Sequence, residues 1–556
     1  MSPTGTIEPP PADPGKRAPR SKRERRPRRA TSLVANGEPW IWLTGGSLAL
    51  ALLMILGLLT QVLAKGLPTF SPARVVRITT LDGRTVMGEV DTSERYRPEP
   101  QLLERLPEPV LERARELLEA QDGESGRLRL RTGNFDLTNT HYTWISDFEI
   151  ATQDRPDWAL VVERLEWGRF YGFPQAILID GEETRGDPAR IWALFEQHHP
   201  DVRQRWRERR SLETHDVGRV SARQEKARLA RDTARLEHGQ DSAAWRAADE
   251  RFQAVQAEAN REFERISAVL GAINEVNARY QLVLAAADGQ EKTLGLADVV
   301  RAYPANPLGL GQRLGVYASR LAEFLVDEPR NANQEGGVYP AIFGTVAMTL
   351  IMSILVVPFG VLAALYLREY AKQGPIVSTV RIAVNNLAGV PSIVFGVFGL
   401  GFFCYIIGAR VDELFFAASL PNPTYAKGGL LWASLTLALL TLPVVIVPSE
   451  EALAAVPGSM REGSYACGAT KWQTIRRIVL PRALPGIMTG MILAIARGAG
   501  EVAPLMLVGA VDKADDLPLD GVPPYIHPQR SFMHLGYHIY DLGFMSQNSE
   551  AAKPMV

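Results

Sequence analysis

Between two long apolar segments the chain reads Glu462-Gly463-Ser464-Tyr465-Ala466-Cys467-Gly468 and then, further on, Ile478-Val479-Leu480-Pro481. Two reciprocal capping patterns predict the starts of two short helices here: Ser459 with Glu462, and Thr470 with Gln473. Gly468 lies between these helices, where a helix commonly ends in a left-handed residue that glycine adopts at little cost. Pro481 is expected to stop the second helix, because proline cannot continue the hydrogen-bond ladder. The pattern predicts a helix–glycine–helix elbow, and a solvated amphipathic loop is the plainer alternative.

Five segments are long enough and poor enough in charge to cross a bilayer, which takes about 20 apolar residues: 41–64, 340–367, 382–409, 428–449 and 483–511. A charged block, residues 66–337, separates the first from the second. Lysine and arginine concentrate in the N-terminal tail, around Arg368, Lys372 and Arg381, and in the loop 450–482. Cytoplasmic loops carry an excess of these residues. We therefore expect a cytoplasmic N-terminus, with the charged block and the C-terminal segment 512–556 outside.

The first 35 residues are rich in proline and arginine. They lack the apolar residues that a core needs, so we expect a disordered, basic cytoplasmic tail. A topogenic tail beside anionic lipid explains these charges better than nucleic-acid binding does. The apolar segment 41–64 exceeds the roughly 7 to 15 apolar residues of a signal peptide. We therefore expect a membrane helix there, with cleavage after Ala64 as the alternative.

The charged block mixes strand and helix patterns. Strand-like stretches recur at 75–90, 128–150, 159–180 and 281–300, and Asp82-Gly83 and Asp288-Gly289 are typical hairpin turns. Other apolar residues follow the spacing of a coiled-coil seam: Phe252, Val255, Ala259, Ile266, Val269, Ile273, Val276 and Tyr280. A preceding helix that ends near Gly239, before a new start at Asp241 or Ser242, is the expected antiparallel partner. We predict an α+β domain with a helical hairpin over about residues 185–285.

Cysteine and histidine spacing indicates neither disulfides nor a metal site. The two cysteines, Cys404 and Cys467, lie outside the charged block, so no disulfide can stabilise it. A block of this size buries a sufficient core without one. The histidines lack paired spacing with cysteines or carboxylates. No nucleophile with a base and an orienting group is visible either, so we expect neither a cofactor nor an enzyme active site.

The last apolar segment contains two charges, in the run Ala496-Arg497-Gly498-Ala499-Gly500-Glu501-Val502-Ala503-Pro504. The flanking apolar runs are each too short to cross alone, so we expect one span with Arg497 near the bilayer midplane. Glu501 follows one helical turn later, where the two side chains can pair. A buried charge normally faces a pathway or a partner, and a guanidinium matches a tetrahedral oxyanion. We hypothesise that Arg497 binds an anion transiently and that Glu501 holds it otherwise; a purely structural ion pair is the alternative.

A second polar stretch interrupts the third apolar segment and reads Asn385-Asn386-Leu387-Ala388-Gly389-Val390-Pro391-Ser392-Ile393-Val394-Phe395-Gly396. Two amides and a Gly-Val-Pro break suggest that Asn385 and Asn386 line a pathway. Hydrogen bonding between helices explains them equally well.

The run from Asn386 to Gly396, the elbow, and the Arg-x-x-Gly-Glu-x-Ala-Pro segment together resemble the phosphate-specific ABC importer permeases of the PstA type. The resemblance covers residues of the predicted permease domain, 338–511. It implies an all-α membrane core like that of type I ABC importers. The charged block, which the basic loops place outside, is then a large α+β extracytoplasmic insertion to which nothing can be transferred from the family. It also implies a bacterial inner membrane, a heterodimer with a second permease, two copies of a separate ABC ATPase and a periplasmic phosphate-binding protein. Consistent with this, the chain has no phosphate loop of its own.

The resemblance also implies roles for single residues. Arg497 and Glu501 match the charged pair implicated in phosphate passage. The residues matched to ATPase coupling are Glu462, Gly463, Gly468, Ala469, Thr470, Ile478, Leu480 and Pro481. Val502 stands where threonine is usual, the insertion is absent from shorter members, and a final membrane helix is missing before Val556. We expect a truncated chain, or a neighbour that supplies the missing wall. Another oxyanion, such as sulfate or molybdate, and a membrane-anchored coiled-coil sensor or scaffold are the alternative functions.

Overall fold

The computed structural model of the protein describes residues 38–514, 516–521, 523–546, 552 and 555–556. The basic tail predicted over residues 1–35 lies outside the described residues. The chain divides into two units, Met1–Pro68 and Thr69–Val556. In the first unit, α1 (Glu38–Gly66) exposes its apolar side chains, and it is long and apolar enough to cross a membrane.

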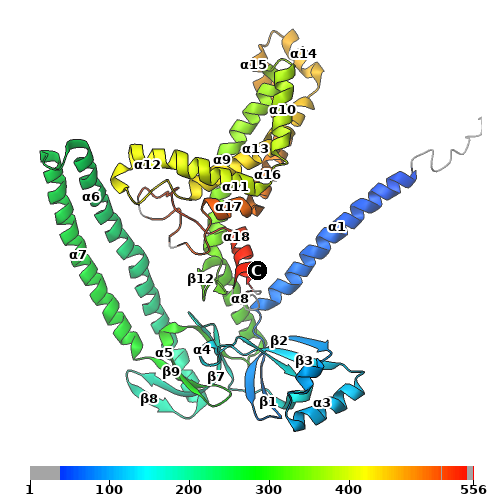
Figure 1. Ribbon diagram of the computed structural model, residues 1–556, viewed down its shortest axis with the longest axis vertical. Helices are drawn as coiled ribbons and strands as arrows, with labels where there is room; N and C mark the ends of the chain where they lie inside the picture. Colours follow the sequence, from blue (N-terminus) through cyan, green and yellow to red (C-terminus); the bar gives the residue numbers. More distant parts are fainter. Residues whose placement is uncertain (1–37, 515, 522, 547–551, 553–554) are drawn as a thin grey trace, which may run out of the picture. The chain divides into compact units, whose positions relative to one another are not determined.

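The second unit begins with an antiparallel sheet of five strands in the order β4-β3-β2-β1-β5 (Figure 1). The strands are β1 (Val75–Thr80), β2 (Thr85–Tyr96), β3 (Ser125–Arg131), β4 (Tyr142–Ser146) and β5 (Ile150–Asp154). Two helices, α2 (Pro100–Leu103) and α3 (Glu108–Ala120), are inserted between β2 and β3. Gly83 has a φ of 85° in the β1–β2 turn, which confirms the hairpin predicted from Asp82-Gly83.

A second sheet has the strand order β10-β9-β7-β6-β11, with β8 paired to β7. Its strands are β6 (Leu160–Arg164), β7 (Arg169–Ile179), β8 (Glu182–Arg185), β9 (Gln281–Ala285), β10 (Glu291–Gly295) and β11 (Val299–Pro304). The predicted Asp288-Gly289 hairpin is present as β9–β10, with a φ of 87° at Gly289. Buried Ile191, Phe195 and Val202 of α5 (Pro188–Ser211) pack on this sheet, so the sheet forms the base from which the helices leave.

The helical hairpin consists of α6 (Val217–His238) and α7 (Ala243–Ala278), and the π-helical turn η3 (Leu212–Asp216) joins α6 to α5. The Ser242 hydroxyl accepts a hydrogen bond from the Trp245 amide and caps α7, as the sequence predicts. The predicted seam is only partly correct, because Ala259 and Ile266 are buried whereas Val269 and Val276 are exposed. An α-helix has 3.6 residues per turn, so without supercoiling the contact line drifts from a heptad seam.

A buried ion network joins the second sheet to α8 (Leu310–Val326) and to β12 (Pro329–Arg330), which pairs with β13 (Glu335–Gly336). Glu163 pairs with Arg320 at 2.5 Å and also with Arg301. Burial works to raise the pKa of Glu163, but the charges of Arg320 and Arg301 hold that pKa well below its ordinary value. The β12–β13 hairpin follows α8 and precedes the next apolar helix, so the network lies close in sequence to the point where the membrane part begins.

The membrane part contains four further helical segments that are long and apolar enough to cross a membrane: Tyr339–Tyr370, Ser392–Phe415, Leu430–Ala454 and Lys471–Gly500. Its elements are α9 (Tyr339–Leu365), η5 (Tyr366–Tyr370), α10 (Pro375–Leu387), α11 (Ser392–Phe398), η6 (Gly399–Gly408), α12 (Ala409–Phe415), η7 (Ala417–Ser419), α13 (Leu430–Ala454), α14 (Gly458–Ala466), α15 (Lys471–Thr474), η8 (Ile475–Val479), α16 (Leu480–Gly500), α17 (Ala503–Val508), α18 (Leu535–Tyr540) and η9 (Asp541–Met545). The number of candidate spans, five with α1, agrees with the sequence.

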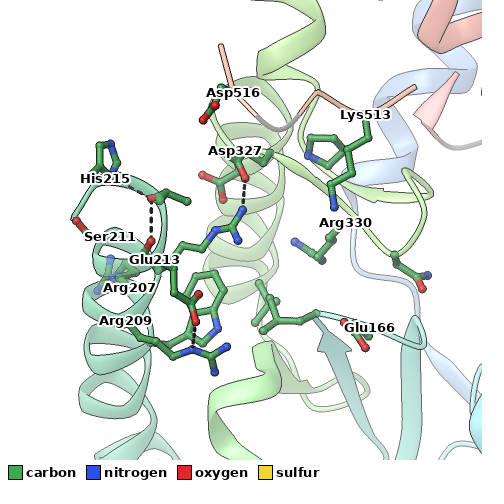
Figure 2. Close-up of a pocket in the computed structure, with 18 of the residues that line it drawn as sticks. Glu166, Arg207, Arg209, Ser211, Glu213, His215, Asp327, Arg330, Lys513 and Asp516 are labelled. Atoms are coloured by element: carbon green, nitrogen blue, oxygen red, sulfur yellow. Dashed lines mark hydrogen bonds and ion pairs between the residues drawn. The ribbon is translucent and has the colours of Figure 1, made fainter. Parts of the chain in front are cut away.

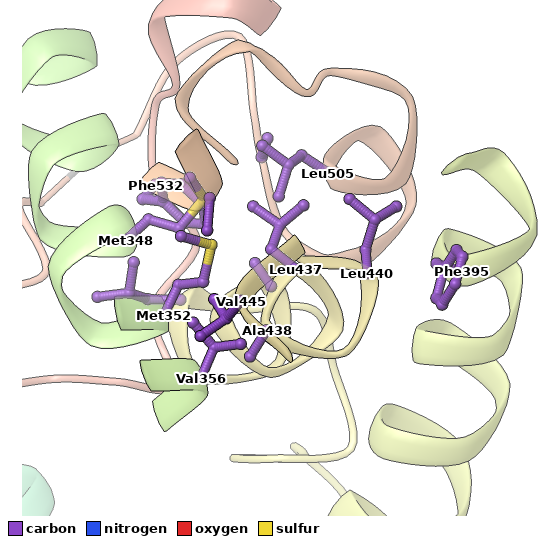
Figure 3. Close-up of a cluster of buried hydrophobic side chains, with 14 residues drawn as sticks. Met348, Met352, Val356, Phe395, Leu437, Ala438, Leu440, Val445, Leu505 and Phe532 are labelled. Atoms are coloured by element: carbon purple, nitrogen blue, oxygen red, sulfur yellow. The ribbon is translucent and has the colours of Figure 1, made fainter. Parts of the chain in front are cut away.

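Helix α13 is the centre of this part. It packs against both α9 and α16, and 67% of its apolar window is buried, against 28–33% in the other three segments. Figure 3 shows Met348, Met352 and Val356 of α9 beside Leu437 and Val445 of α13. Helices that leave most of their apolar surface exposed are suited to face lipid or another membrane subunit.

Two predicted spans have the wrong boundaries. The segment predicted at 382–409 is divided, because α10 ends at Leu387 and the apolar helix begins only at Ser392. Pro391 restricts the preceding residue to extended conformations, so the helix cannot run through. The segment predicted at 483–511 instead ends at Gly500.

Candidate functional site

The two charges predicted to pair in the last apolar segment do so. Arg497 Nε donates to Glu501 Oε1 at 3.3 Å, and the side chains are 36% and 18% exposed. This single hydrogen bond uses one of the five guanidinium N–H donors and leaves the others available for another acceptor. The pair is therefore loosely held and reachable from one side of the chain.

The pair sits at the end of a helix and not in the middle of one. Arg497 lies in the last turn of α16, and Glu501 is extended, with a φ of −77° and a ψ of 131°, before α17 begins at Ala503. The prediction of a single span that runs through both charges is therefore wrong. The helical hydrogen-bond ladder can end here because of Gly498, Gly500 and Pro504. A cation such as Arg497 is also favourable beside the carbonyl end of a helix.

Close backbone packing fixes the break. A Cβ on Gly498 would lie 2.6 Å from Met352 Sδ, so α16 comes close to α9 at this level, and a side chain there would displace the end of the Met352 side chain. A Cβ on Gly396 would lie 2.7 Å from Pro504 Cα, so α11 contacts the start of α17 directly. The Arg497–Glu501 segment is thus flanked by a side-chain contact with α9 and a backbone contact with α11. The sequence carries Gly396 in the Gly-Val-Pro stretch, but its role depends on a contact with a residue 108 positions away.

The structure does not bring Asn385 and Asn386 to this pair. Both lie on α10 and are exposed, and α10 is separated from α11 by the Gly389–Pro391 break. Leu387 and Val390 instead pack against the core around α13. A role for the two amides in lining a pathway remains a hypothesis.

The elbow is present, with one of its two predicted capping boxes. Thr470 and Gln473 cap each other reciprocally at the start of α15, and Gly468 is left-handed with a φ of 80°. The predicted box at Ser459 is wrong, because α14 already begins at Gly458 after Pro457 and Ser459 is inside the helix. The fixed φ of Pro457 suits the residue before a helix, so this helix starts without a side-chain cap.

Pro481 does not stop the second helix, contrary to the prediction. The helical run continues from Lys471 to Gly500 through the π-helical turn η8, and Pro481 occupies the first turn of α16. A π-helical turn widens the ladder locally, which accommodates a ring that would clash with the carbonyl four residues earlier. As a result, the elbow is joined rigidly to the helix that carries Arg497.

Glu369 anchors the elbow, and the sequence analysis missed it. Arg461 donates to Glu369 Oε1 at 2.9 Å and to the carbonyl oxygens of Leu453 and Val456 at the end of α13. Lys471 contacts the Glu369 carbonyl oxygen. A single carboxylate within the basic stretch 368–381 was the available signal. The arrangement ties three elements, η5, α13 and α14, together at one point.

The outer face of the elbow is exposed. Glu462, Gly463, Gly468 and Thr470 are exposed, as is Pro481, whereas Ala469, Ile478 and Leu480 are partly covered. Tyr465 and Trp472 add large exposed apolar surface on the same elbow. The inner face packs through Ile475 and Val479 against α9 and α13. An exposed face with aromatic residues, backed by a fixed inner face, is a suitable docking surface.

Comparison with known proteins agrees with these features. Residues 356–520 match the family of binding-protein-dependent transport system inner membrane components. The phosphate transport system permease protein PstA of Mycobacterium leprae is 44% identical over 176 residues, which is 31% of this chain and 52% of that protein. The matched region is therefore similar to PstA-type permeases. It contains the central helix α13, the elbow and the Arg497–Glu501 pair.

Other proteins similar to this region have similar coverage. PstA of Yersinia pestis is 36% identical over 193 residues, 34% of this chain and 59% of that protein. The phosphate transport system permease protein PstC of Mesorhizobium japonicum is 31% identical over 195 residues, 33% of this chain and 59% of that protein. The chain thus spans about half to three-fifths of the length of the curated relatives it matches. Among the described residues, no group of three or more histidine, cysteine or acidic side chains is placed to hold a metal ion.

Proposed function

We propose that this chain is a membrane-spanning permease subunit of an ATP-driven importer of inorganic phosphate in a bacterial inner membrane. It forms half of the pathway, and a second permease forms the other half. Two copies of a separate ABC ATPase drive the cycle, and a periplasmic phosphate-binding protein delivers the solute. The similarity to permeases named for phosphate transport supports this solute class.

The observation that carries the proposal is the loosely held Arg497–Glu501 pair at the end of α16. An exchangeable pair is what an anion pathway needs, because a phosphate oxygen can replace the carboxylate as the partner of the guanidinium. The helix break releases backbone groups, and membranes accept such groups where a cavity or neighbouring protein satisfies them. The exposed side of the pair is where the second permease completes the wall.

Coupling follows from the connection between the elbow and α16. The ATPase engages the exposed face that includes Glu462, Gly463 and Gly468, while Ile478, Leu480 and Pro481 belong to the helical run that leads to Arg497. Movement of the docked ATPase is therefore transmitted along a continuous helix to the anion site. In the same proposal the N-terminus is cytoplasmic and residues 66–337 are periplasmic, because the basic loops lie on the elbow's side.

The test is uptake of labelled phosphate into vesicles that contain all the proposed subunits. Arg497→Lys removes the guanidinium fork and is expected to reduce uptake about tenfold or more, since a charge-assisted hydrogen bond contributes about 1.5–3 kcal/mol. Arg410→Lys is the matched control, because Arg410 also pairs with a nearby glutamate, at 2.7 Å, but is 75% exposed. Wild-type uptake in Arg497→Lys would remove Arg497 from the mechanism. Stronger competition by sulfate than by unlabelled phosphate would contradict phosphate as the solute.

A further inference from the structure

A cavity of about 1930 Å³ lies between α5, the loop from β12 to β13 and the segment 513–530 (Figure 2). Asn333 Nδ2 donates to the Asp512 carbonyl oxygen at 2.9 Å, which ties the β12–β13 loop to the segment that carries Lys513. Asn331, Ala332 and Asn333 all have positive φ values, between 50° and 65°, so this loop turns sharply at the edge of the cavity. The cavity is thus built from segments far apart in the sequence.

Some of the charges around the cavity are paired within it. Three arginines that line it pair with carboxylates that also line it: Arg209 with Glu213, Arg210 with Glu328, and Arg530 with Asp520. Among the residues that the structure describes, Arg203, Arg207 and Lys513 have no carboxylate within 4 Å. Glu166, Asp327 and Asp516 also line the cavity, so eight lysine or arginine side chains face six carboxylates there, and a formal excess of two positive charges remains.

Cationic side chains meet at one corner of the cavity. Figure 2 shows the Lys513 side chain directed toward Arg330, although both groups are cationic. The Arg330 guanidinium pairs with Glu323, and its Nε is buried without a hydrogen-bond partner. Arg203 is held by the Ala297 carbonyl oxygen at 3.2 Å and by the face of Trp206 at 4.2 Å, neither of which neutralises it.

The lowered pKa of Arg203 also indicates that cations are close together here. Burial lowers its pKa to about 10, and the next strongest influences are the charges of Arg330 and Arg207. Asp327 and Asp298 act in the opposite direction but less strongly. Cations that crowd each other in a partly buried corner gain most from a bound anion, because the anion relieves the repulsion and replaces lost hydration.

We propose that Arg203, Arg330 and Lys513 form an accessory binding site for a tetrahedral oxyanion, separate from Arg497. Two guanidinium groups supply planar donors that match such an anion, and the ammonium of Lys513 adds a mobile charge from the facing segment. The anion occupies only this corner, since the whole cavity exceeds the roughly 300–1,000 Å³ of a small-molecule site. Phosphate and sulfate share the required chemistry. The site lies between the insertion, which supplies Arg203 and Arg330, and the C-terminal segment, which supplies Lys513, and so goes beyond the transport function proposed above.

The test is amide hydrogen exchange of the full chain in detergent with sodium phosphate, sodium sulfate or sodium chloride at equal ionic strength. Phosphate or sulfate is expected to slow exchange at residues 329–334 and 512–514, and chloride is not. Lys513→Gln and Arg203→Gln are each expected to weaken the apparent affinity about tenfold. Arg219→Gln is the matched control, because Arg219 lines the same cavity but is 66% exposed and pairs with Asp216.

The two oxyanions distinguish the preferred ligand, since the one that protects at the lower concentration is the one that the site selects. Equal protection by chloride, no protection by either oxyanion, or unchanged protection in both variants would overturn the proposal. Arg497→Lys is expected to leave this protection unchanged. Failure of the accessory site can therefore be told apart from failure of the transport proposal.

Discussion

Arg461→Met is expected to loosen the elbow while leaving α13 and α16 folded. Arg461 makes three hydrogen bonds: to Glu369 at 2.9 Å, to the Leu453 carbonyl oxygen at 2.8 Å and to the Val456 carbonyl oxygen at 2.5 Å. The carbonyl groups at the end of a helix have no partner within the helix. Methionine keeps much of the side-chain volume but donates to none of the three oxygens.

The free-energy cost of Arg461→Met follows from how deeply the Arg461–Glu369 ion pair is buried. The Arg461 and Glu369 side chains are 18% and 9% exposed, so water replaces the lost partner poorly. Removing one member of a buried ion pair costs about 3–5 kcal/mol, and the partial exposure places this case near about 3 kcal/mol. Since about 1.4 kcal/mol corresponds to a factor of ten, the elbow is expected to open on the order of 100-fold more often.

The assay is amide hydrogen exchange of the full chain in detergent. The reporters are the amides of Cys467, Gly468 and Thr474, which donate within the elbow to Gly463, Tyr465 and Thr470 respectively. Arg476→Met is the control, because Arg476 is exposed on the same elbow. A change of less than about threefold at these amides, with Arg461→Met and Arg476→Met alike, would refute the view that Arg461 anchors the elbow.

Three further changes test other parts of the structure. Gly396→Val places a side chain against Pro504 and is expected to lower the free energy of unfolding by about 1–3 kcal/mol, measured by thermal unfolding of the detergent-solubilised chain. Gly401→Val, in open space on the same span, is the control, and equal effects of the two changes would contradict the close contact at Gly396. Gly468 has a φ of 80°, so Gly468→Ala is expected to destabilise the elbow by about 1 kcal/mol and to speed amide exchange there. Gly463→Ala, inside α14, is expected to slow amide exchange in the elbow, and faster exchange in Gly463→Ala than in Gly468→Ala would contradict the left-handed turn. Because the pKa of Glu163 is lowered, its ion pairs stabilise the fold above pH 4.5, the ordinary pKa of a glutamate, and this contribution declines as the pH falls below 4.5. Glu163→Gln is expected to speed amide exchange in β6 and β7 at pH 7 and to reduce the difference in exchange between acid and neutral pH. An unchanged pH profile of exchange would refute the network's role.

Local signals in the sequence were sufficient for much of the fold. Both Asp-Gly turns form hairpins, because glycine supplies the positive φ wherever the strands are placed. The Thr470–Gln473 box also depends only on residues three apart. The Arg497–Glu501 pair forms at the predicted spacing even though the helix between them ends. The sequence could not reveal that end, since a run of small residues is compatible with both a helix and a break.

Other features required contacts between distant residues. The exposure of Val269 and Val276 depends on how α7 lies against α6 and the sheet, which a periodic pattern does not specify. The continuation of the helix past Pro481 depends on a π-helical turn, and the packing of η8 against α9 and α13 supports it.

The sequence by itself determined the class of protein, because runs of about 20 apolar residues, basic loops and short capping motifs are properties of neighbouring residues. Tertiary structure alone decided where the polar groups meet. Glu369 reaches Arg461 across 92 residues, and Lys513 is directed toward Arg330 at one corner of the cavity, because folding converts distance along the chain into proximity in space. Such contacts depend on packing of whole helices and strands, and no local pattern encodes that packing.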